Sequence, residues 1–289
     1  MGPASGHHGG VEKLRELARL VEGGGVAVLS GAGLSTESGI PDYRGPKSVP
    51  RTPMTYQVFT GDPAARQRYW ARSHLGWRTI ARAAPNDGHR AVAHLQQQGL
   101  LAGLVTQNVD GLHQAAGASD VVELHGNLDR VVCLTCGDAL SREELETRLT
   151  QANPGFDAHV ATVNPDGDVE LPDDRVAGFH VADCQTCHGG MLKPDVVFFG
   201  ETVPAERVQA CFRLVESSRL LLVLGSSLTV MSGRRFVLRA AKLDIPVAIV
   251  NQGPTRGDSY AALTVDAPLG VALPELARLT GARVGAAGT

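Results

Sequence analysis

TQNVDGLHQAAGASDVVELHG, residues Thr106 to Gly126, is the stretch from which the fold of this 289-residue chain is predicted. The apolar run before it predicts a strand that stops at polar side chains, and VVEL predicts a second strand that ends at His125. Ligands bind at the carboxyl ends of strands in open α/β sheets. Any one of these polar groups could simply cap a turn, but together they predict one crevice lined by Gln107, Asn108, Asp110 and His125.

Upstream, the sequence VAVLSGAG predicts a buried strand over residues 26–30 that runs into Gly31 and Gly33. A strand followed by closely spaced glycines is how a Rossmann-type sheet brings backbone N–H groups against a dinucleotide pyrophosphate. Thr36 replaces the usual third glycine, so the pattern alone fits a tight strand-to-helix turn equally well. The loop that follows carries an acid, an aromatic ring and a guanidinium at Asp42, Tyr43 and Arg44.

The remaining periodicity alternates helices with strands. Helices are predicted over 11–22, 65–83, 86–98 and around Cys211, and strands over 196–199, 220–224, 246–251 and 263–265. This alternation predicts an α/β fold with a Rossmann-like, doubly wound parallel sheet. The predicted division is a disordered leader (1–10), a Rossmann-like domain (11–45, 88–128 and 191–289), a helical insertion (46–87) and a cysteine-containing module (129–190).

Four of the five cysteines form two CxxC pairs, which predict one metal site. Paired CxxC sequences offer four thiolates to a tetrahedral Zn²⁺, and four protein ligands leave no position for water, so the zinc would be structural. Two unrelated redox or chance pairs are the alternative. The predicted ligands are Cys133, Cys136, Cys184 and Cys187, while Cys211 is predicted to be a buried core residue.

Composition narrows the classes of partner. The formal net charge of −3 and the pI near 6.4 give no electrostatic reason to expect nucleic acid or an anionic membrane. The longest apolar runs are too short to span a bilayer, and the first ten residues lack the apolar core of a signal peptide. We therefore expect a cytoplasmic protein; the sequence does not indicate an oligomeric state.

Taken together, the ordered motifs resemble those of the sirtuin family. They are GAGLSTESGIPDYRG, TQNVDGLHQAAG, ELHG, the two CxxC pairs, KPDVVFFGE, GSSL and IVNQGP, and the resemblance extends from about residue 11 to about residue 279. The segment RQRYWARSHLGW is similar to the branch that contains the mitochondrial form four and its bacterial relatives.

The resemblance implies an NAD-dependent protein-lysine deacylase that acts on acyl-lysine protein substrates. It also implies one structural zinc ion and a Rossmann-like domain that binds NAD. The positions that match the family's cofactor motifs are Gly31, Ala32, Gly33, Thr36, Asp42, Tyr43, Arg44, Gln107, Asn108, Val109, Asp110, Gly225, Ser226, Ser227, Asn251, Gln252, Gly253 and Leu269.

For catalysis the resemblance implies His125, Asn108 and Asp110. In the implied reaction, the acyl-lysine carbonyl oxygen would attack the nicotinamide ribose and expel nicotinamide. His125 would then be the general base that removes a proton from a ribose hydroxyl. Water would complete the reaction, giving free lysine and 2′-O-acyl-ADP-ribose. The segment Val197, Phe198, Phe199 and Gly200 would pair with the substrate backbone as an added strand.

Several functional alternatives stay open. Tyr69 and Arg72 have the Tyr-x-x-Arg spacing that sirtuin desuccinylases use for acidic acyl groups, so acidic or longer acyl chains are one alternative. Transfer of ADP-ribose to a protein nucleophile would use the same pocket. A non-catalytic, NAD-sensing module held together by zinc is the third.

Overall fold

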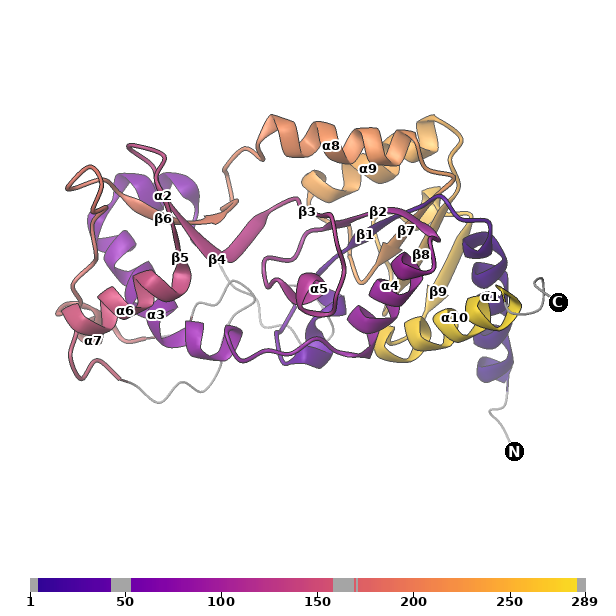
Figure 1. Cartoon of the computed structure of the whole chain (residues 1–289), viewed down its shortest axis with the longest axis horizontal. Helices are drawn as coiled ribbons and strands as arrows, with labels where there is room; N and C mark the ends of the chain where they lie inside the picture. Colours follow the sequence, from indigo (N-terminus) through magenta and orange to yellow (C-terminus); the bar gives the residue numbers. More distant parts are fainter. Residues whose placement is uncertain (1–4, 43–52, 158–168, 170, 285–289) are drawn as a thin grey trace.

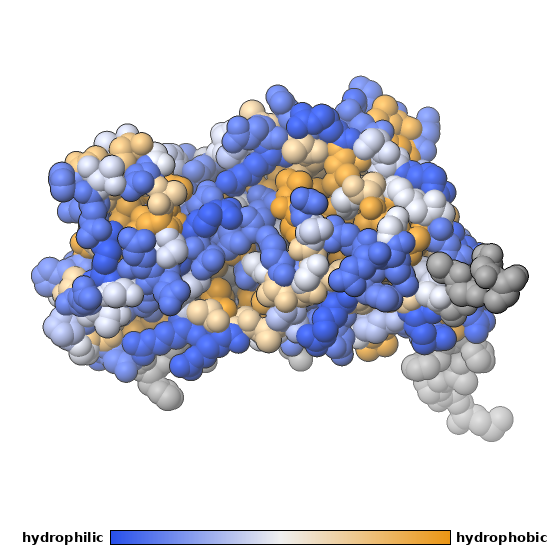
Figure 2. Space-filling model, in the orientation of Figure 1, coloured by the Kyte–Doolittle hydropathy of each residue, from blue (hydrophilic) through white to orange (hydrophobic). Residues whose placement is uncertain are grey.

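A computed structural model describes residues 5–42, 53–157, 169 and 171–284. Its backbone forms a six-stranded sheet and a three-stranded sheet, which lie towards opposite ends of an elongated molecule (Figure 1). The predicted combination of a Rossmann-like sheet with a smaller cysteine-containing module and a helical insertion is confirmed. On the face shown in Figure 2, hydrophilic residues surround smaller hydrophobic areas.

The larger sheet is parallel throughout and has the strand order β3-β2-β1-β7-β8-β9. This is the order of a dinucleotide-binding Rossmann sheet, in which the chain reverses direction of growth beside the first strand. The strands are β1 (Val26–Ser30), β2 (Leu101–Thr106), β3 (Val121–Glu123), β7 (Leu220–Leu224), β8 (Val247–Asn251) and β9 (Leu263–Asp266).

Helices cover both faces of this sheet because alternate strand residues point to opposite sides. Val28 lies in the core under α1, α4 and α10, whereas Leu29 lies in the core under α8 and α9 (Figure 1). The helices are α1 (Ser5–Glu22), α4 (Asp87–Gln97), α8 (Ala205–Glu216), α9 (Met231–Lys242) and α10 (Leu269–Val284), with a short turn η3 (Asp258–Tyr260). Within the described residues, no helix is both long and apolar enough to cross a bilayer.

The smaller sheet is antiparallel, with the order β5-β4-β6, and its core is built around a buried arginine. The guanidinium of Arg142 lies 5.4 Å from the ring centre of Trp70 and 5.1 Å from that of Trp77, and donates to the Ser73 carbonyl at 3.0 Å. The elements are β4 (Gly126–Cys133), β5 (Ala139–Ser141), β6 (Leu192–Val196), α2 (Tyr56–Gly61), α3 (Pro63–Ile80), α6 (Arg142–Ala152) and α7 (Asp173–Val176).

The strand predicted over residues 196–199 is wrong. The strand is β6, Leu192–Val196, and it pairs with β4 of the smaller sheet. In the sequence, Lys193 and Pro194 argue against a strand at the position of β6. However, β6 is an edge strand, where a proline is tolerated, and Lys193 is buried with its amine 3.2 Å from the carboxylate of Glu201.

The helix predicted over residues 11–22 is longer than expected, because α1 begins at Ser5; the disordered leader predicted over residues 1–10 stays a prediction. Once a helix has nucleated, each added residue contributes one hydrogen bond, so the glycines before residue 11 weaken the first turns without ending them. Residues 1–4 lie outside the described part of the chain. The residue ranges assigned to the domains stay a prediction, although β6 belongs with the smaller sheet.

Candidate active site and zinc centre

The carboxyl ends of four neighbouring strands lie in line. The sheet register pairs Ser30 with Thr106, Thr106 with Glu123, and Ser30 with Leu224. The loops that leave β1, β2, β3 and β7 therefore start at one edge of the sheet. This edge brings together the predicted site residues Gly31, Gln107, Asn108, His125, Gly225 and Ser226.

The predicted glycine turn packs against the end of β7 with no space for side chains. A Cβ atom on Gly33 would lie 3.0 Å from Cα of Gly225, and one on Gly31 would lie 2.7 Å from Cβ of Ser226. The backbone N–H of Gly33 donates to the Gly225 carbonyl at 2.9 Å. Ala32 opens the short turn η1 (Ala32–Leu34), so this contact packs the turn after β1 against the end of β7, backbone to backbone.

Asn108 and Asp110 are joined through Ser35. The Ser35 hydroxyl donates to Asp110 Oδ2 at 2.7 Å, and the Asn108 side-chain amide donates to Ser35 Oγ at 3.0 Å and to the Gly31 carbonyl at 3.1 Å. Burial raises the pKa of the Asp110 carboxyl, and the hydrogen bond from Ser35 partly opposes that rise. Ser35, which lies within the motif GAGLSTESGIPDYRG, has no predicted role; the structure shows that it links two predicted site residues.

A pair of buried histidines lies behind this group and was missed in the sequence. The rings of His89 and His113 are 5.1 Å apart, and His113 Nε2 lies 2.8 Å from the hydroxyl of Ser30. Burial lowers the pKa of His89 to about 4 and that of His113 to about 3, so both are neutral at pH 7. His113, in α5 (Leu112–Ala115), belongs to the stretch that predicts the fold, but its spacing there carries no signal for burial.

His125 is oriented through both of its ring nitrogens. Its Nδ1 lies 3.0 Å from the backbone carbonyl of Gln107, and its Nε2 lies 2.9 Å from the hydroxyl of Ser232. A carbonyl oxygen only accepts hydrogen bonds, so Nδ1 carries the proton. Burial lowers the pKa of His125, the Gln107 carbonyl partly opposes this, and the charges of Arg235 and Arg207 lower it further. The ring is therefore neutral at pH 7, with Nε2 unprotonated.

The predicted substrate segment is held between His125 and the start of α2. The N–H of Val197 donates to the His125 carbonyl at 2.8 Å, and the Phe199 carbonyl accepts from the Tyr56 N–H at 2.9 Å. The Gly200 carbonyl accepts from the side chain of Gln57 at 3.0 Å. These contacts place the segment directly beside His125.

Tyr69 meets this segment, whereas Arg72 is anchored to a neighbouring loop. The Tyr69 ring is almost fully buried, with its centre 5.2 Å from that of Phe198 and 5.3 Å from that of Phe59. The guanidinium of Arg72, half-buried one turn later on α3, donates to the Leu171 carbonyl at 3.4 Å.

The other predicted cofactor residues are spread along the same edge. Thr36, in η2 (Thr36–Ser38), donates to the Gly33 carbonyl at 3.1 Å, and the Asn251 amide donates to the carbonyls of Gln252 and Gly253 at 2.9 Å each. The structure also places Asp42, Val109, Gln107, Ser226, Ser227 and the buried Leu269 within its described residues, whereas Tyr43 and Arg44 lie outside them.

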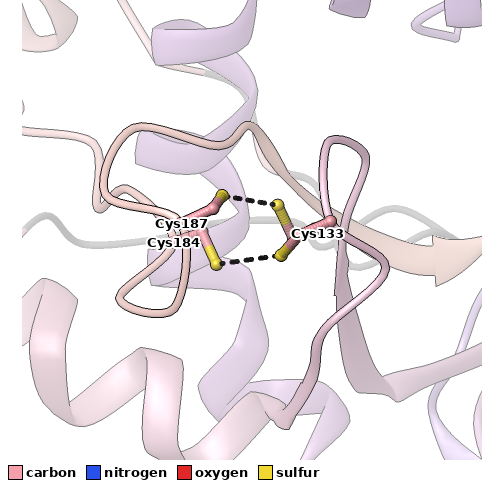
Figure 3. A group of neighbouring side chains, drawn as sticks. Cys133, Cys184 and Cys187 are labelled. Carbon is pink, nitrogen blue, oxygen red and sulfur yellow. Dashed lines mark hydrogen bonds between the residues drawn. The ribbon is translucent and has the colours of Figure 1, made fainter.

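The four cysteines of the two CxxC pairs converge at the end of β4 (Figure 3). Their sulfur atoms all lie within 4.8 Å of one another, and the Cys133–Cys187 and Cys136–Cys184 sulfur pairs are each 3.7 Å apart. A disulfide would need about 2.05 Å. A zinc tetrahedron with bonds of about 2.3 Å has edges of about 3.8 Å. The cluster therefore fits one structural Zn²⁺ ion, and the alternative of unrelated pairs is wrong.

Comparison with known proteins agrees with this geometry. The sequence pattern of the Sir2 family matches residues 31–232, well over half of the chain. The chain belongs to the Sir2 family. The match includes both the histidine between the two sheets and the cysteine cluster.

Individual Sir2 relatives extend the match to nearly the whole chain. NAD-dependent protein deacetylase 1 of Streptomyces coelicolor is 60% identical over 282 residues, 97% of this chain and 94% of that protein. The mitochondrial NAD-dependent protein lipoamidase sirtuin-4 of Bos taurus is 44% identical, over 91% of this chain and 85% of that protein. A solved structure of Sir2 with a p53 peptide and NAD⁺ has a TM-score of 0.73 at 29% identity and covers 94% of this chain and 99% of that one.

Proposed function

We propose that this chain is an NAD-dependent protein-lysine deacetylase, which releases nicotinamide and forms 2′-O-acyl-ADP-ribose. One observation carries the proposal. The unprotonated Nε2 of His125 and the hydrogen-bonded group Asn108–Ser35–Asp110 lie at the ends of neighbouring strands. Homologues named NAD-dependent protein deacetylase, at up to 60% identity, support the same activity.

The residues at this edge fit NAD. Backbone without side chains at Gly31, Gly33 and Gly225 suits a pyrophosphate, and the amide–acid pair of Asn108 and Asp110 suits the nicotinamide carboxamide and its ribose. When bound, NAD supplies a glycosidic bond whose cleavage drives acyl transfer. Ser226 and Ser227 follow β7, and Asn251 is the last residue of β8; these three residues would bind the adenosine end.

His125 acts as the general base. Nδ1 is committed to the Gln107 carbonyl, so Nε2 is the atom that takes a proton from a ribose hydroxyl. The pKa of His125, lowered by burial, keeps Nε2 free of a proton at pH 7. Asp110, whose pKa is raised by burial, is held by Ser35 next to Asn108 and orients the ligand.

The substrates we propose are acyl-lysine side chains of proteins. We propose that an extended peptide pairs with the segment Val197–Gly200, whose Val197 N–H is bonded to the His125 carbonyl; this mode of binding tolerates varied sequences. A solved relative holds a p53 peptide, which supports a protein substrate. We propose a cytoplasmic location, because a four-thiolate zinc site suits a reducing compartment.

A panel of acyl-lysine peptides with NAD tests the proposal. We expect nicotinamide release that depends on the peptide, together with 2′-O-acyl-ADP-ribose detected by mass spectrometry. An ADP-ribosylated protein without deacylated peptide would instead support ADP-ribosyl transfer. Absence of nicotinamide release with every peptide would contradict both enzyme functions and favour an NAD-sensing module.

The pH dependence follows from the state of His125. Its pKa is lowered by burial and by the nearby charges of Arg235 and Arg207, so the neutral base persists below the ordinary imidazole pKa of about 6.5. Activity is lost as the pH falls through the lowered pKa, because the ring then becomes protonated. We expect the acid limb of kcat/KM for the acetyl peptide to have its midpoint below pH 6.5; a midpoint above 7 would contradict this.

Acyl preference is a second, finer question. The Tyr-x-x-Arg spacing is the basis for proposing an acidic or longer acyl group; in the structure Tyr69 packs on Phe198 of the substrate segment, and Arg72 lies three residues later on α3. Sirtuin-4 of Bos taurus is named a lipoamidase, which favours a longer chain. Comparing kcat/KM on acetyl-, succinyl- and lipoyl-lysine peptides decides between these groups.

If Arg72 binds an acyl carboxylate, Arg72→Met should lower kcat/KM for the succinyl peptide by about 10- to 100-fold, as expected for one charge-assisted pair, and leave the acetyl peptide within about twofold. Arg68→Met, on the same helix, is the matched control for loss of a charge. A wild-type protein that strongly favours acetyl would end the acidic-acyl alternative.

A further inference from the structure

Ser232 is the hydrogen-bond partner of His125 at Nε2, the nitrogen that must accept a proton in the proposed reaction. It lies in the first turn of α9, and its hydroxyl is 2.9 Å from Nε2 of His125. The two residues are 107 positions apart in the sequence and both are half-buried. No family motif quoted above includes Ser232.

The direction of this hydrogen bond follows from the other nitrogen. Nδ1 donates to the Gln107 carbonyl, which cannot donate in return. In the neutral ring Nε2 therefore has only a lone pair, and the Ser232 hydroxyl must be the donor. Carbonyl and hydroxyl together clamp the ring from both ends and select the tautomer whose Nε2 is basic.

The position of Ser232 is fixed by close packing of α9 on Gln107. A Cβ atom on Gly233 would lie 2.4 Å from the side-chain oxygen of Gln107, so a larger residue there would have to displace the Gln107 side chain. The Gln107 amide in turn donates to the Ser226 hydroxyl at 2.8 Å. The start of α9 is thus held against β2 by the same residue that orients His125.

The charged groups around the ring come from two helices. Arg235 of α9 and Arg207 of α8 both act on His125, and Arg207 is also 3.2 Å from the carboxylate of Asp195. Among the described residues, neither arginine donates to the ring, whose hydrogen-bond contacts are the Gln107 carbonyl and the Ser232 hydroxyl. Ser232 is therefore the side chain that orients Nε2.

We propose that Ser232 is a positioning residue that holds His125 in one orientation and one tautomer, and yields Nε2 to the substrate hydroxyl when that hydroxyl binds. This inference rests on the proposed function. Its consequence is specific to the step that needs a base: the earlier cleavage that releases nicotinamide does not use Nε2, so loss of Ser232 affects the two steps differently.

Kinetics of Ser232→Ala provide the first test. We expect kcat for acetyl-peptide deacylation to fall about 3- to 10-fold, the size of one hydrogen bond, with KM for NAD and the rate of nicotinamide–NAD exchange within about twofold of wild type. Ser232→Thr, which keeps the hydroxyl, should retain kcat. Ser217→Ala, at the end of α8, is the control for loss of a serine hydroxyl away from the site. Unchanged deacylation by Ser232→Ala would overturn the proposal.

Nitrogen-15 NMR of the histidine rings, without NAD or peptide, provides the second test. In wild type we expect the His125 signals of a protonated Nδ1 and a hydrogen-bonded, unprotonated Nε2, assigned by their loss in His125→Asn. In Ser232→Ala the Nε2 signal should shift towards that of a free acceptor. An identical spectrum would contradict the contact. Because this measurement needs no turnover, it remains decisive even if no acyl peptide releases nicotinamide.

Discussion

Replacing Cys184 with serine is expected to remove zinc from the protein, unfold the smaller sheet and abolish deacylation. The four sulfur atoms lie at the spacing of a zinc tetrahedron, and Cys133 and Cys184 are buried. Structural zinc contributes on the order of 10 kcal/mol to the folding of small zinc modules. The cluster joins the end of β4 to the loop that leads into β6, so its loss releases both strands.

The effect should reach the active site because β4 starts directly after His125, and β6 ends directly before the substrate segment. Zinc content by mass spectrometry, thermal unfolding and nicotinamide release measure the three consequences. Cys211→Ala is the matched control: Cys211 is a buried residue of α8, outside the cluster, so this variant should keep one zinc per chain. A Cys184→Ser protein with wild-type stability and activity would show that the cluster is not a structural zinc site.

Strand β1 could be predicted to the residue because its sequence is self-contained. The run VAVLS is buried at every position and lies between glycines, so burial on both faces and the strand ends are both visible locally. The cysteine pairs were predictable for a similar reason, since ligand type and spacing together state the chemistry. Local patterns therefore located the sheet edge and the zinc site.

The parts that could not be predicted depend on contacts between distant segments. Lys193 looks like a surface residue, and becomes a strand residue only because Glu201 neutralises it and its amine donates to the Pro194 carbonyl. Ser35 gains a role only when the fold brings Asp110, 75 residues later, to its hydroxyl. No local pattern encodes such partners, so the residues that hold the predicted site residues in place could be identified only from the structure.

Replacing His125 with asparagine is expected to lower kcat for deacylation by about 10²- to 10⁴-fold, the usual contribution of a general base. Asparagine preserves a polar group near the Gln107 carbonyl but offers no atom that takes a proton at neutral pH. Zinc content should stay at one per chain, because His125 is not a ligand of the cluster. His94→Asn, on the exposed side of α4, is the matched histidine control and should behave as wild type.

The comparison of two rates makes this variant decisive for the mechanism. Nicotinamide–NAD exchange in the presence of acetyl peptide depends on binding and on cleavage of the glycosidic bond, for which Asn108 and Asp110 are the proposed residues. Exchange should therefore survive in His125→Asn while deacylation is lost. Loss of both exchange and deacylation in a folded, zinc-loaded variant would indicate that His125 acts in ligand binding and not in proton transfer. Retention of deacylation within tenfold of wild type would exclude His125 as the base. Among the described residues, no other neutral imidazole with an unprotonated nitrogen faces this edge and could replace it, because His89 and His113 are buried behind Ser30 and Ser35.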